Sequence, residues 1–285
     1  MKFSLEKSES PSVNVSSLCR AVKMSTANWY KGRRQRQRKK VDESLVAELV
    51  KRERKTHPRM GGRKLLDLLS VDFTEAGMKI GRDRFFDVLR RNGLLVPPLP
   101  KSCKTTNSRH SLEVFHNLVK DVRETAANEV WVSDITYIRT ENDWAYLSLI
   151  MDRFSRKIVG WHCSRTLESM GCVKALEKAV SEMPGGPSPI HHSDRGCQYC
   201  CHEYVNLLHK HCFSISMTET NHCAENSHAE RVNGTLKTEY GLAATFNSFE
   251  QARKAAAQAI WIYNTQRPHS SLGYRKPAEV HSLAS

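Results

Sequence analysis

EVWVSDITYI, residues 129–138, is the stretch of this chain that decides the fold. Its β-branched and aromatic residues predict a strand, and that strand carries one acidic side chain, Asp134. Because successive side chains of a strand point to opposite faces, Val132, Asp134 and Thr136 should share one face. The opposite face should hold Trp131, Ser133, Ile135 and Tyr137. A carboxylate among the apolar residues of a rigid strand is a candidate ligand for a hard cation.

Two further acidic residues follow in segments of different character. Asp194 lies in PIHHSDRGCQY (189–199), where it closes a short apolar run. Glu230 lies in ENSHAERVNGTLKTEY (225–240), which has a helical pattern, and 35 residues separate it from Asp194. Hard oxygen ligands on rigid elements, converging on one point, are what a two-metal phosphoryl-transfer site requires. The three carboxylates are therefore the candidate catalytic and metal-binding residues, provided that the fold brings them together.

The helical segment around Glu230 offers more than a carboxylate. Lys237 lies seven positions further on, two turns away and on nearly the same face of the helix. Asn226 and Asn233 flank Glu230 on that side. A carboxylate, an amide and a lysine on one face would present a metal ligand and a phosphate contact to one DNA strand. Lys237 is therefore a candidate DNA contact, the alternative being an ordinary solvated lysine.

The sequence around these segments predicts an α/β fold, which we assign to residues 123–285. Three β-branched and aromatic runs separated by short turns predict an antiparallel meander at 130–140, 144–152 and 157–164. Two shorter strands are expected at 189–194 and 213–218. Helices are expected at 167–183, 201–212, 223–240 and 249–264, before a tail rich in Pro, His and Ser. This order gives a mixed sheet flanked by helices.

The first part of the chain, residues 1–96, predicts a domain made of helices. Residues 13–31 have the pattern of two short helices, the second capped by Ser25. A further helix is expected over 41–56, and the last helix of the domain should close at Gly93. Short helices joined by tight glycine-containing turns are typical of a helix-turn-helix DNA-binding unit.

Charge is distributed unevenly between the two parts. Residues 1–110 carry 26 Lys and Arg against 11 Asp and Glu, whereas residues 111–285 carry 18 against 19. The run KGRRQRQRKK (31–40) alone holds seven basic residues in ten. A basic domain is expected to meet a polyanion, because counterion release from nucleic acid favours binding. The candidate DNA-binding residues in this part are Arg33, Arg34, Arg36, Arg38, Arg82 and Arg84.

Length and composition predict a protein of two domains that is neither a membrane protein nor a secreted protein. The 285 residues suffice for two domains, and a proline-rich linker is expected between them at 97–122. No apolar stretch predicts a membrane span or a signal peptide, so no membrane partner is expected. Nine cysteines at irregular spacing, without a secretion signal, predict reduced thiols and a cytoplasmic location.

Several strings resemble one known family. WVSDITYI, LIMDRFSRKIVGW, HHSDRGCQY, AERVNGTLKTEY and YNTQRPHSSLGYRKP are similar, in this order, to the second-reading-frame product of insertion-sequence-three family transposases. HPRMGGRKLLDLL and GRDRFFDVLRRNGLL resemble the helix-turn-helix that precedes their integrase-type core. The similarity covers about residues 15–280.

The resemblance implies a ribonuclease-H-like fold and a DDE transposase that cuts and joins DNA strands. It implies two Mg²⁺ ions, with Mn²⁺ as a substitute: Asp134 would bridge both ions, while Asp194 and Glu230 would each hold one. It implies DNA partners, namely the element's terminal repeats and target DNA, and self-association into a synaptic multimer. It leaves open whether the chain acts alone or as a fusion with an upstream-frame product. The expected location is the bacterial cytoplasm, on the nucleoid when bound to DNA.

Other interpretations stay open at this stage. Asp152 fits a turn or an ion pair better than a metal role, and His192 either tunes the site or is a strand histidine with satisfied hydrogen bonds. For the whole chain, one alternative is a helix-turn-helix regulator with an inactive core. The other is a plain metal-dependent nuclease.

A crowd of cysteines and histidines raises the question of a zinc site. Its members are Cys197, Cys200, Cys201, His202, His209, His211, Cys212, His222 and Cys223. The spacing between them matches neither a zinc finger nor a zinc ribbon. Small buried or half-exposed thiols are therefore the favoured interpretation, and structural zinc is the alternative.

Overall fold

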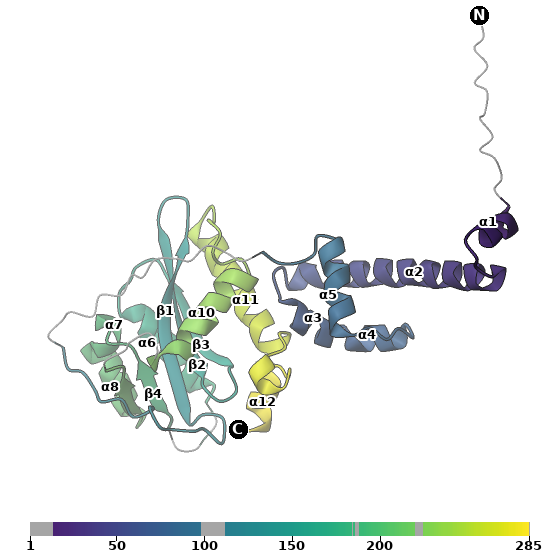
Figure 1. The fold of residues 1–285 in the computed structure, drawn as a ribbon. Helices are drawn as coiled ribbons and strands as arrows, with labels where there is room; N and C mark the ends of the chain where they lie inside the picture. Colours follow the sequence, from purple (N-terminus) through teal and green to yellow (C-terminus); the bar gives the residue numbers. More distant parts are fainter. Residues whose placement is uncertain (1–13, 98–111, 184, 186–187, 220–224, 285) are drawn as a thin grey trace, which may run out of the picture.

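The computed structural model describes residues 14–97, 112–183, 185, 188–219 and 225–284. Figure 1 shows two parts: an α/β core that includes the C-terminus, and a helical unit from which one long helix projects. Within the described residues, no helix is both long enough and apolar enough to cross a membrane.

The core is built on one five-stranded sheet. Its strands are β1 (Val130–Arg139), β2 (Trp144–Asp152), β3 (Ile158–Ser164), β4 (Ile190–Ser193) and β5 (Ser214–Met217). The order across the sheet is β3-β2-β1-β4-β5. The first three strands pair antiparallel as the predicted meander, and β4 and β5 run parallel to β1. This is the ribonuclease-H-like arrangement, so the predicted fold class is confirmed, and it sets β1 beside β4.

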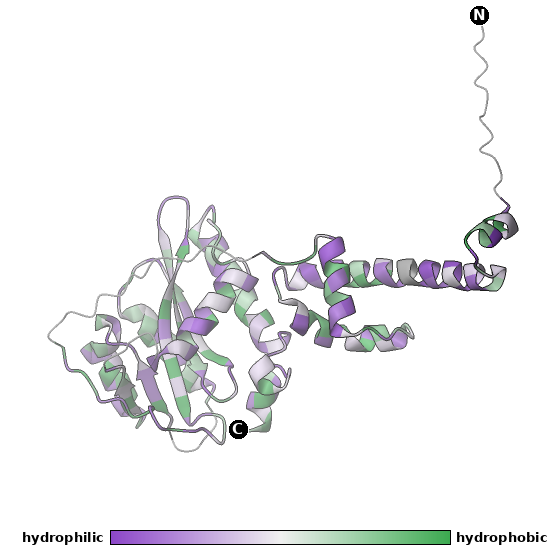
Figure 2. Cartoon of the chain, viewed as in Figure 1, coloured by the Kyte–Doolittle hydropathy of each residue, from purple (hydrophilic) through white to green (hydrophobic). Residues whose placement is uncertain are grey.

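Helices cover both faces of the sheet (Figure 1). They are α6 (Met170–Ser181), α7 (Cys197–Cys200) and α8 (His202–Lys210) on one face, and α10 (Ser227–Glu239) and α11 (Phe249–Thr265) on the other. On β1, Val132 packs with residues of α10 and α11, whereas Trp131 packs with residues of α6 and α8. The predicted alternation of the two faces of β1 is thereby confirmed. In Figure 2, apolar residues (green) recur along the strands between these helices.

The C-terminal tail, for which no element was predicted, contains a further helix. α12 (Pro277–Leu283) packs against α11, and its Val280 and His281 are buried. Pro277 stands at the first helical position, where its missing N–H costs no hydrogen bond and its fixed φ favours the helix. Because the tail is rich in Pro, His and Ser, its sequence pattern did not predict this short helix or its apolar contact with α11.

The helical unit has its own apolar core. It consists of α1 (Val15–Ala21), α2 (Thr26–Thr56), α3 (Gly62–Leu68), α4 (Ser70–Glu75) and α5 (Arg82–Arg91). Ser25 caps α2 as predicted, since its Oγ accepts a hydrogen bond from the N–H of Asn28. Fully or almost fully buried residues of this core include Val50, Leu65, Leu69, Phe85 and Leu89. The predicted all-helical character of this part is confirmed.

The long helix α2 departs from the prediction. The sequence predicted a short helix, a basic run and a second helix over 41–56, but Thr26–Thr56 is one continuous helix of 31 residues. Arg, Lys and Gln have high helix propensities, and no proline interrupts the segment, so the helix continues through the basic run. At 1.5 Å per residue α2 is about 46 Å long. Its N-terminal half stands away from the rest of the molecule (Figure 1).

The predicted linker, 97–122, is divided. Residues 98–111 lie outside the described residues, and residues 112–122 lie along the core. The N–H of Leu118, for example, donates to Oγ of Ser216 on β5 at 2.9 Å. The second half of the predicted linker therefore belongs to the core, because core groups satisfy its backbone.

Candidate active site

Asp134 lies in the middle of the central strand. It is the fifth residue of β1 and is paired with Leu149 of β2. Its side chain is half-buried, and its Oδ2 accepts a hydrogen bond from Nδ2 of Asn233 on α10 at 2.8 Å. The carboxylate is thus held on the face of the sheet that α10 covers.

Asp194 follows the last residue of β4, the strand next to β1. Val132 and His192 are partners in the parallel register of these strands, and two residues further along each strand bring Asp134 and Asp194 to the same level. Neighbouring strands are about 4.8 Å apart. Oδ1 of Asp194 accepts the N–H of Gly196 at 2.9 Å, which turns the chain away from the sheet after the carboxylate.

Glu230 reaches the same region from a helix. It lies in the first turn of α10, which packs on β1 through the buried residues Ala229, Val232 and Leu236. Glu230 itself is exposed. Within the described residues its carboxylate accepts no hydrogen bond, so its position follows that of the helix.

The electrostatics of Asp134 reveal how close the other two carboxylates are. Burial raises the pKa of Asp134 to about 7, and the negative charges of Asp194 and Glu230 add to this rise. The hydrogen bond from Asn233 opposes it. The fold has therefore placed two negative charges near one half-buried carboxyl group, an arrangement that a divalent cation would relieve.

The donor set fits a hard divalent cation. Carboxylate oxygens from two adjacent strands and one helix are the ligands that Mg²⁺ and Mn²⁺ prefer. In the described part of the chain, no three His, Cys, Asp or Glu side chains are yet grouped tightly enough to hold an ion. Glu230 would complete the set by turning its exposed side chain toward the two aspartates.

Two amides and a lysine on α10 surround the carboxylates. Asn226, the residue before α10, is buried and donates from Nδ2 to the backbone oxygen of Ser133 at 2.9 Å. Lys237 is half-buried; burial lowers its pKa, and the nearby charge of Asp134 opposes that shift. The spacing of residues 226, 230, 233 and 237 predicted that they share one face of a helix. Their roles as tethers of β1 and Asp134 could not be read from spacing alone.

Comparison with known proteins gives the family. Two family models, each described as Integrase core domain, match residues 124–223 and 211–277. The chain is 34% identical to the "Insertion element IS600 uncharacterized 31 kDa protein" of Shigella sonnei over 254 residues, 87% of this chain and 92% of the relative. It is 28% identical over 292 residues to "Transposase InsF for insertion sequence IS3A" of Escherichia coli K12, and the match covers 99% of each. The chain belongs to the IS3 family of transposases.

Two solved structures are similar to parts of the transposase. The HTLV-2 integrase catalytic core domain in complex with magnesium is 17% identical with a TM-score of 0.44, covering 56% of this chain and 99% of that chain. The integrase of a simian T-cell lymphotropic virus intasome is 18% identical with a TM-score of 0.46, covering 78% and 70%. The ribonuclease-H-like assignment of the transposase rests on its own strand order.

Two polar residues near the carboxylates of the transposase have structural partners. Asp152 is fully buried, and its Oδ1 accepts the N–H of Ser155 at 2.7 Å, as expected for a turn residue. His192 is buried with Nδ1 2.9 Å from Oγ of Ser216, and burial lowers its pKa to about 4. Asp152 therefore stabilises the end of β2, and His192 is a neutral strand histidine.

The crowd of cysteines and histidines in the transposase is spread over several elements. His222 and Cys223 lie outside the described residues. Cys200 is buried with its Sγ 3.7 Å from Sδ of Met217, and Sγ of Cys201 donates to the backbone oxygen of Gln198 at 3.2 Å. These two thiols pack as small side chains of the α7 region.

The predicted DNA-contacting arginines of the transposase fall into two groups. Those exposed on the projecting half of α2 are Arg33, Arg34, Arg36 and Arg38. On α5, Arg82 pairs with its neighbour Asp83 at 2.9 Å. Arg84 pairs with Asp42 of α2 at 3.0 Å and so helps to hold α5 against α2. The α2 group therefore has the less compensated positive charge.

Proposed function

We propose that this transposase cleaves and joins DNA strands at insertion-sequence ends, with Asp134, Asp194 and Glu230 as its catalytic carboxylates. The observation that carries the proposal is the level placement of the two aspartates on β1 and β4, beside the helix that bears Glu230. The pKa of Asp134 adds support, because it is raised chiefly by burial and further by the charges of Asp194 and Glu230. Clustered carboxylates of this kind serve metal-assisted displacement at phosphorus.

In the proposed site, Asp134, Asp194 and Glu230 would together hold two Mg²⁺ ions. When bound, the ions supply Lewis-acid activation of the attacking and leaving oxygens. Asn233 orients Asp134 through its hydrogen bond, and it favours the ionised carboxylate that a metal needs. Lys237 contacts a phosphate of the DNA strand beside the site. Mn²⁺ is expected to substitute for Mg²⁺, because it accepts the same hard ligands.

The helical unit supplies recognition in this proposal. Residues 1–96 bind the terminal repeats, chiefly through the arginines of α2, while the core of residues 123–285 is nearly neutral overall and acts on the bound strands. Because two element ends must meet before they are joined, the active form is a multimer assembled on DNA. An upstream-frame product takes part as a separate subunit or as a fusion. The site of action is the bacterial cytoplasm, on the nucleoid.

The test is incubation of the purified chain with labelled terminal-repeat and target DNA, in Mg²⁺ or in EDTA. Cleaved ends and joined products that form only with Mg²⁺ are the expected result. Specific binding without any cleavage would indicate a DNA-binding regulator with an inactive core. Cleavage of any DNA without joining would indicate a plain nuclease. Either outcome overturns the proposal.

A further inference from the structure

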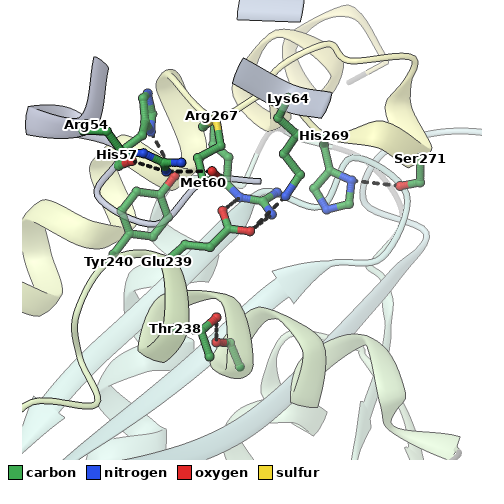
Figure 3. A network of polar contacts seen from close by, with 11 residues as sticks. Arg54, His57, Met60, Lys64, Thr238, Glu239, Tyr240, Arg267, His269 and Ser271 are labelled. Atoms are coloured by element: carbon green, nitrogen blue, oxygen red, sulfur yellow. Dashed lines mark hydrogen bonds and ion pairs between the residues drawn. The ribbon is translucent and has the colours of Figure 1, made fainter. Parts of the chain in front are cut away.

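Two sequence segments with no role in the carboxylate site meet on the end of α10. The first segment, HPRMGGRKLLDLL (57–69), belongs to the helical unit. The second, YNTQRPHSSLGYRKP (263–277), belongs to the core and begins with the last residues of α11. Figure 3 shows residues of both segments around Glu239 and Tyr240, where α10 ends. The contact joins the DNA-recognition part of the molecule to the helix that carries Glu230.

A partly buried charge cluster forms the centre of this contact. Glu239 accepts hydrogen bonds from Nζ of Lys64 at 2.9 Å, and from Nε and Nη2 of Arg267 at 2.8 and 2.9 Å (Figure 3). Arg267 is only 4% exposed. Burial alone would raise the pKa of Glu239, but its two cationic partners hold that pKa below the ordinary value. The carboxylate is therefore ionised and bound by one cation from each part of the molecule.

Uncharged groups complete the contact. Nδ1 of His57 lies 3.3 Å from the hydroxyl of Tyr240, and the two rings meet edge to face at 6.1 Å. Arg54, in the last turn of α2, donates to the backbone oxygen of Met60 at 2.7 Å and so fixes the turn that presents His57 and Lys64. We call Lys64, Glu239, Arg267, His57 and Tyr240 the polar latch.

The latch lies on the same rigid helix as the catalytic glutamate. Glu230 and Glu239 are nine residues apart, which is about 14 Å along the helix axis. Asn226, the residue before α10, donates to the backbone of β1, and Asn233, in the middle of the helix, donates to Asp134. Since Glu230 has no side-chain hydrogen bond of its own in the described structure, these two contacts and the polar latch at the C-terminal end of α10 set where its carboxylate stands.

We propose that Lys64 of the helical unit is a positioning residue for strand transfer, which acts by docking on Glu239 and thereby fixing α10 and Glu230. The inference rests on the function proposed above. A partly buried ion pair adds little net stability, because desolvation offsets its attraction, and in the proposal its role is to hold the two parts in one geometry. A polar contact between domains can also open, as domain interfaces within one chain commonly do. Strand transfer thus requires that the helical unit, which binds the DNA ends, is docked on α10.

The first test is independent of activity. A zero-length carbodiimide reagent joins a lysine to a carboxylate that it contacts, so the full-length protein should give a Lys64–Glu239 cross-link in peptide mass spectra. Glu239→Gln removes the reactive carboxylate and should abolish this product. Absence of the cross-link from wild-type protein would overturn docking, whatever the activity of the preparation.

The second test separates positioning from DNA binding and folding. Lys64→Met should keep end binding within about twofold of the control Lys51→Met, which loses an exposed lysine of α2. Strand transfer by Lys64→Met should fall at least about tenfold and need more Mg²⁺ for half-maximal rate, because Glu230 is less well placed. Lys64→Arg should restore most of the rate, and Glu239→Gln should reproduce the defect, with thermal unfolding showing that each variant is folded.

The outcomes distinguish the inference from the function on which it rests. If wild-type protein joins strands and Lys64→Met joins them equally fast, the inference about Lys64 is overturned and the proposed function stands. The inference is also overturned if end binding falls by the same factor as strand transfer. Wild-type protein that never joins strands overturns the proposed function and the inference together.

Discussion

At the scale of single residues, Asp134 determines how the site responds to pH. Its pKa of about 7 lies well above the value of about 3.9 for an exposed aspartate, because it is packed against the sheet and faces two other carboxylates. In the folded chain without a cation, the proton therefore stays on Asp134 across the weakly acidic range. A divalent cation must displace that proton, so binding should strengthen as pH rises toward 8.

Asp134→Asn is expected to stabilise the metal-free fold, and by more at pH 8 than at pH 5. Between about pH 4 and about pH 7 the folded chain holds a proton that the unfolded chain has lost, so stability falls as pH rises through this window. The amide avoids this loss, on the order of 4 kcal/mol at pH 8, or about 10 °C in Tm. Thermal unfolding in EDTA measures it, with the exposed Asp121→Asn as control. A difference from wild type that stays constant between the two pH values would contradict the raised pKa.

Asn233→Ala is expected to slow strand transfer without weakening end binding. It removes the hydrogen bond that orients Asp134 and favours its ionised form, and such bonds to charged groups are worth about 1.5–3 kcal/mol. The rate at pH 7 should fall at least about tenfold, and the acidic limb of the pH–rate profile should move to higher pH. Rates measured from pH 6.5 to 9, beside the exposed Asn247→Ala, test this. A uniform loss with an unmoved profile would assign Asn233 to folding alone.

At the scale of elements, the sequence was informative where patterns of apolar residues were strong. The alternation in 129–138 fixed both the strand and the face on which Asp134 stands. The continuity of α2 was missed because a run of charges carries no apolar period, although its helix propensity is high. The short α12 was missed because its seven residues are too few to show a helical period of apolar residues.

The unbroken α2 should be sensitive to a helix breaker placed in the basic run. Gln35 is exposed in the projecting half of the helix. Gln35→Pro removes a backbone hydrogen bond and clashes with the preceding turn, at a cost of about 3 kcal/mol or more. We expect lower helicity by circular dichroism and at least about tenfold weaker end binding, whereas Gln35→Ala should leave both unchanged. Equal end binding by the two variants would show that DNA recognition does not require an unbroken α2.

At the scale of the whole molecule, the excess positive charge lies in the first part, and the proposed chemistry lies in the second. The sequence predicted this division from composition, and it predicted the three carboxylates from motif order. It could not predict the polar latch, because Lys64, Glu239 and Arg267 come from segments far apart in the chain and only the tertiary fold makes them neighbours. The same holds for the Asn233 contact with Asp134.

The salt dependence of end binding tests the division of charge. Four Arg→Gln changes at 33, 34, 36 and 38 remove the exposed arginines from the projecting half of α2. For every DNA phosphate that is no longer neutralised, the slope of log K against log salt should fall by about 0.9. Titrations between 50 and 300 mM KCl, with the exposed Lys210→Gln of the core as control, measure the change. An unaltered slope would place the DNA contacts elsewhere.

The central claim is that Asp134, Asp194 and Glu230 form the strand-transfer site while the helical unit binds the ends. The most direct measurement compares end binding and Mg²⁺-dependent strand transfer for wild type, Asp134→Asn and the control Asp121→Asn. We expect Asp134→Asn to keep end binding within about twofold of wild type. Its strand transfer should fall at least about 10³-fold, because several kcal/mol of metal-assisted stabilisation of the transition state are removed. Strand transfer by Asp134→Asn at the wild-type rate would contradict it.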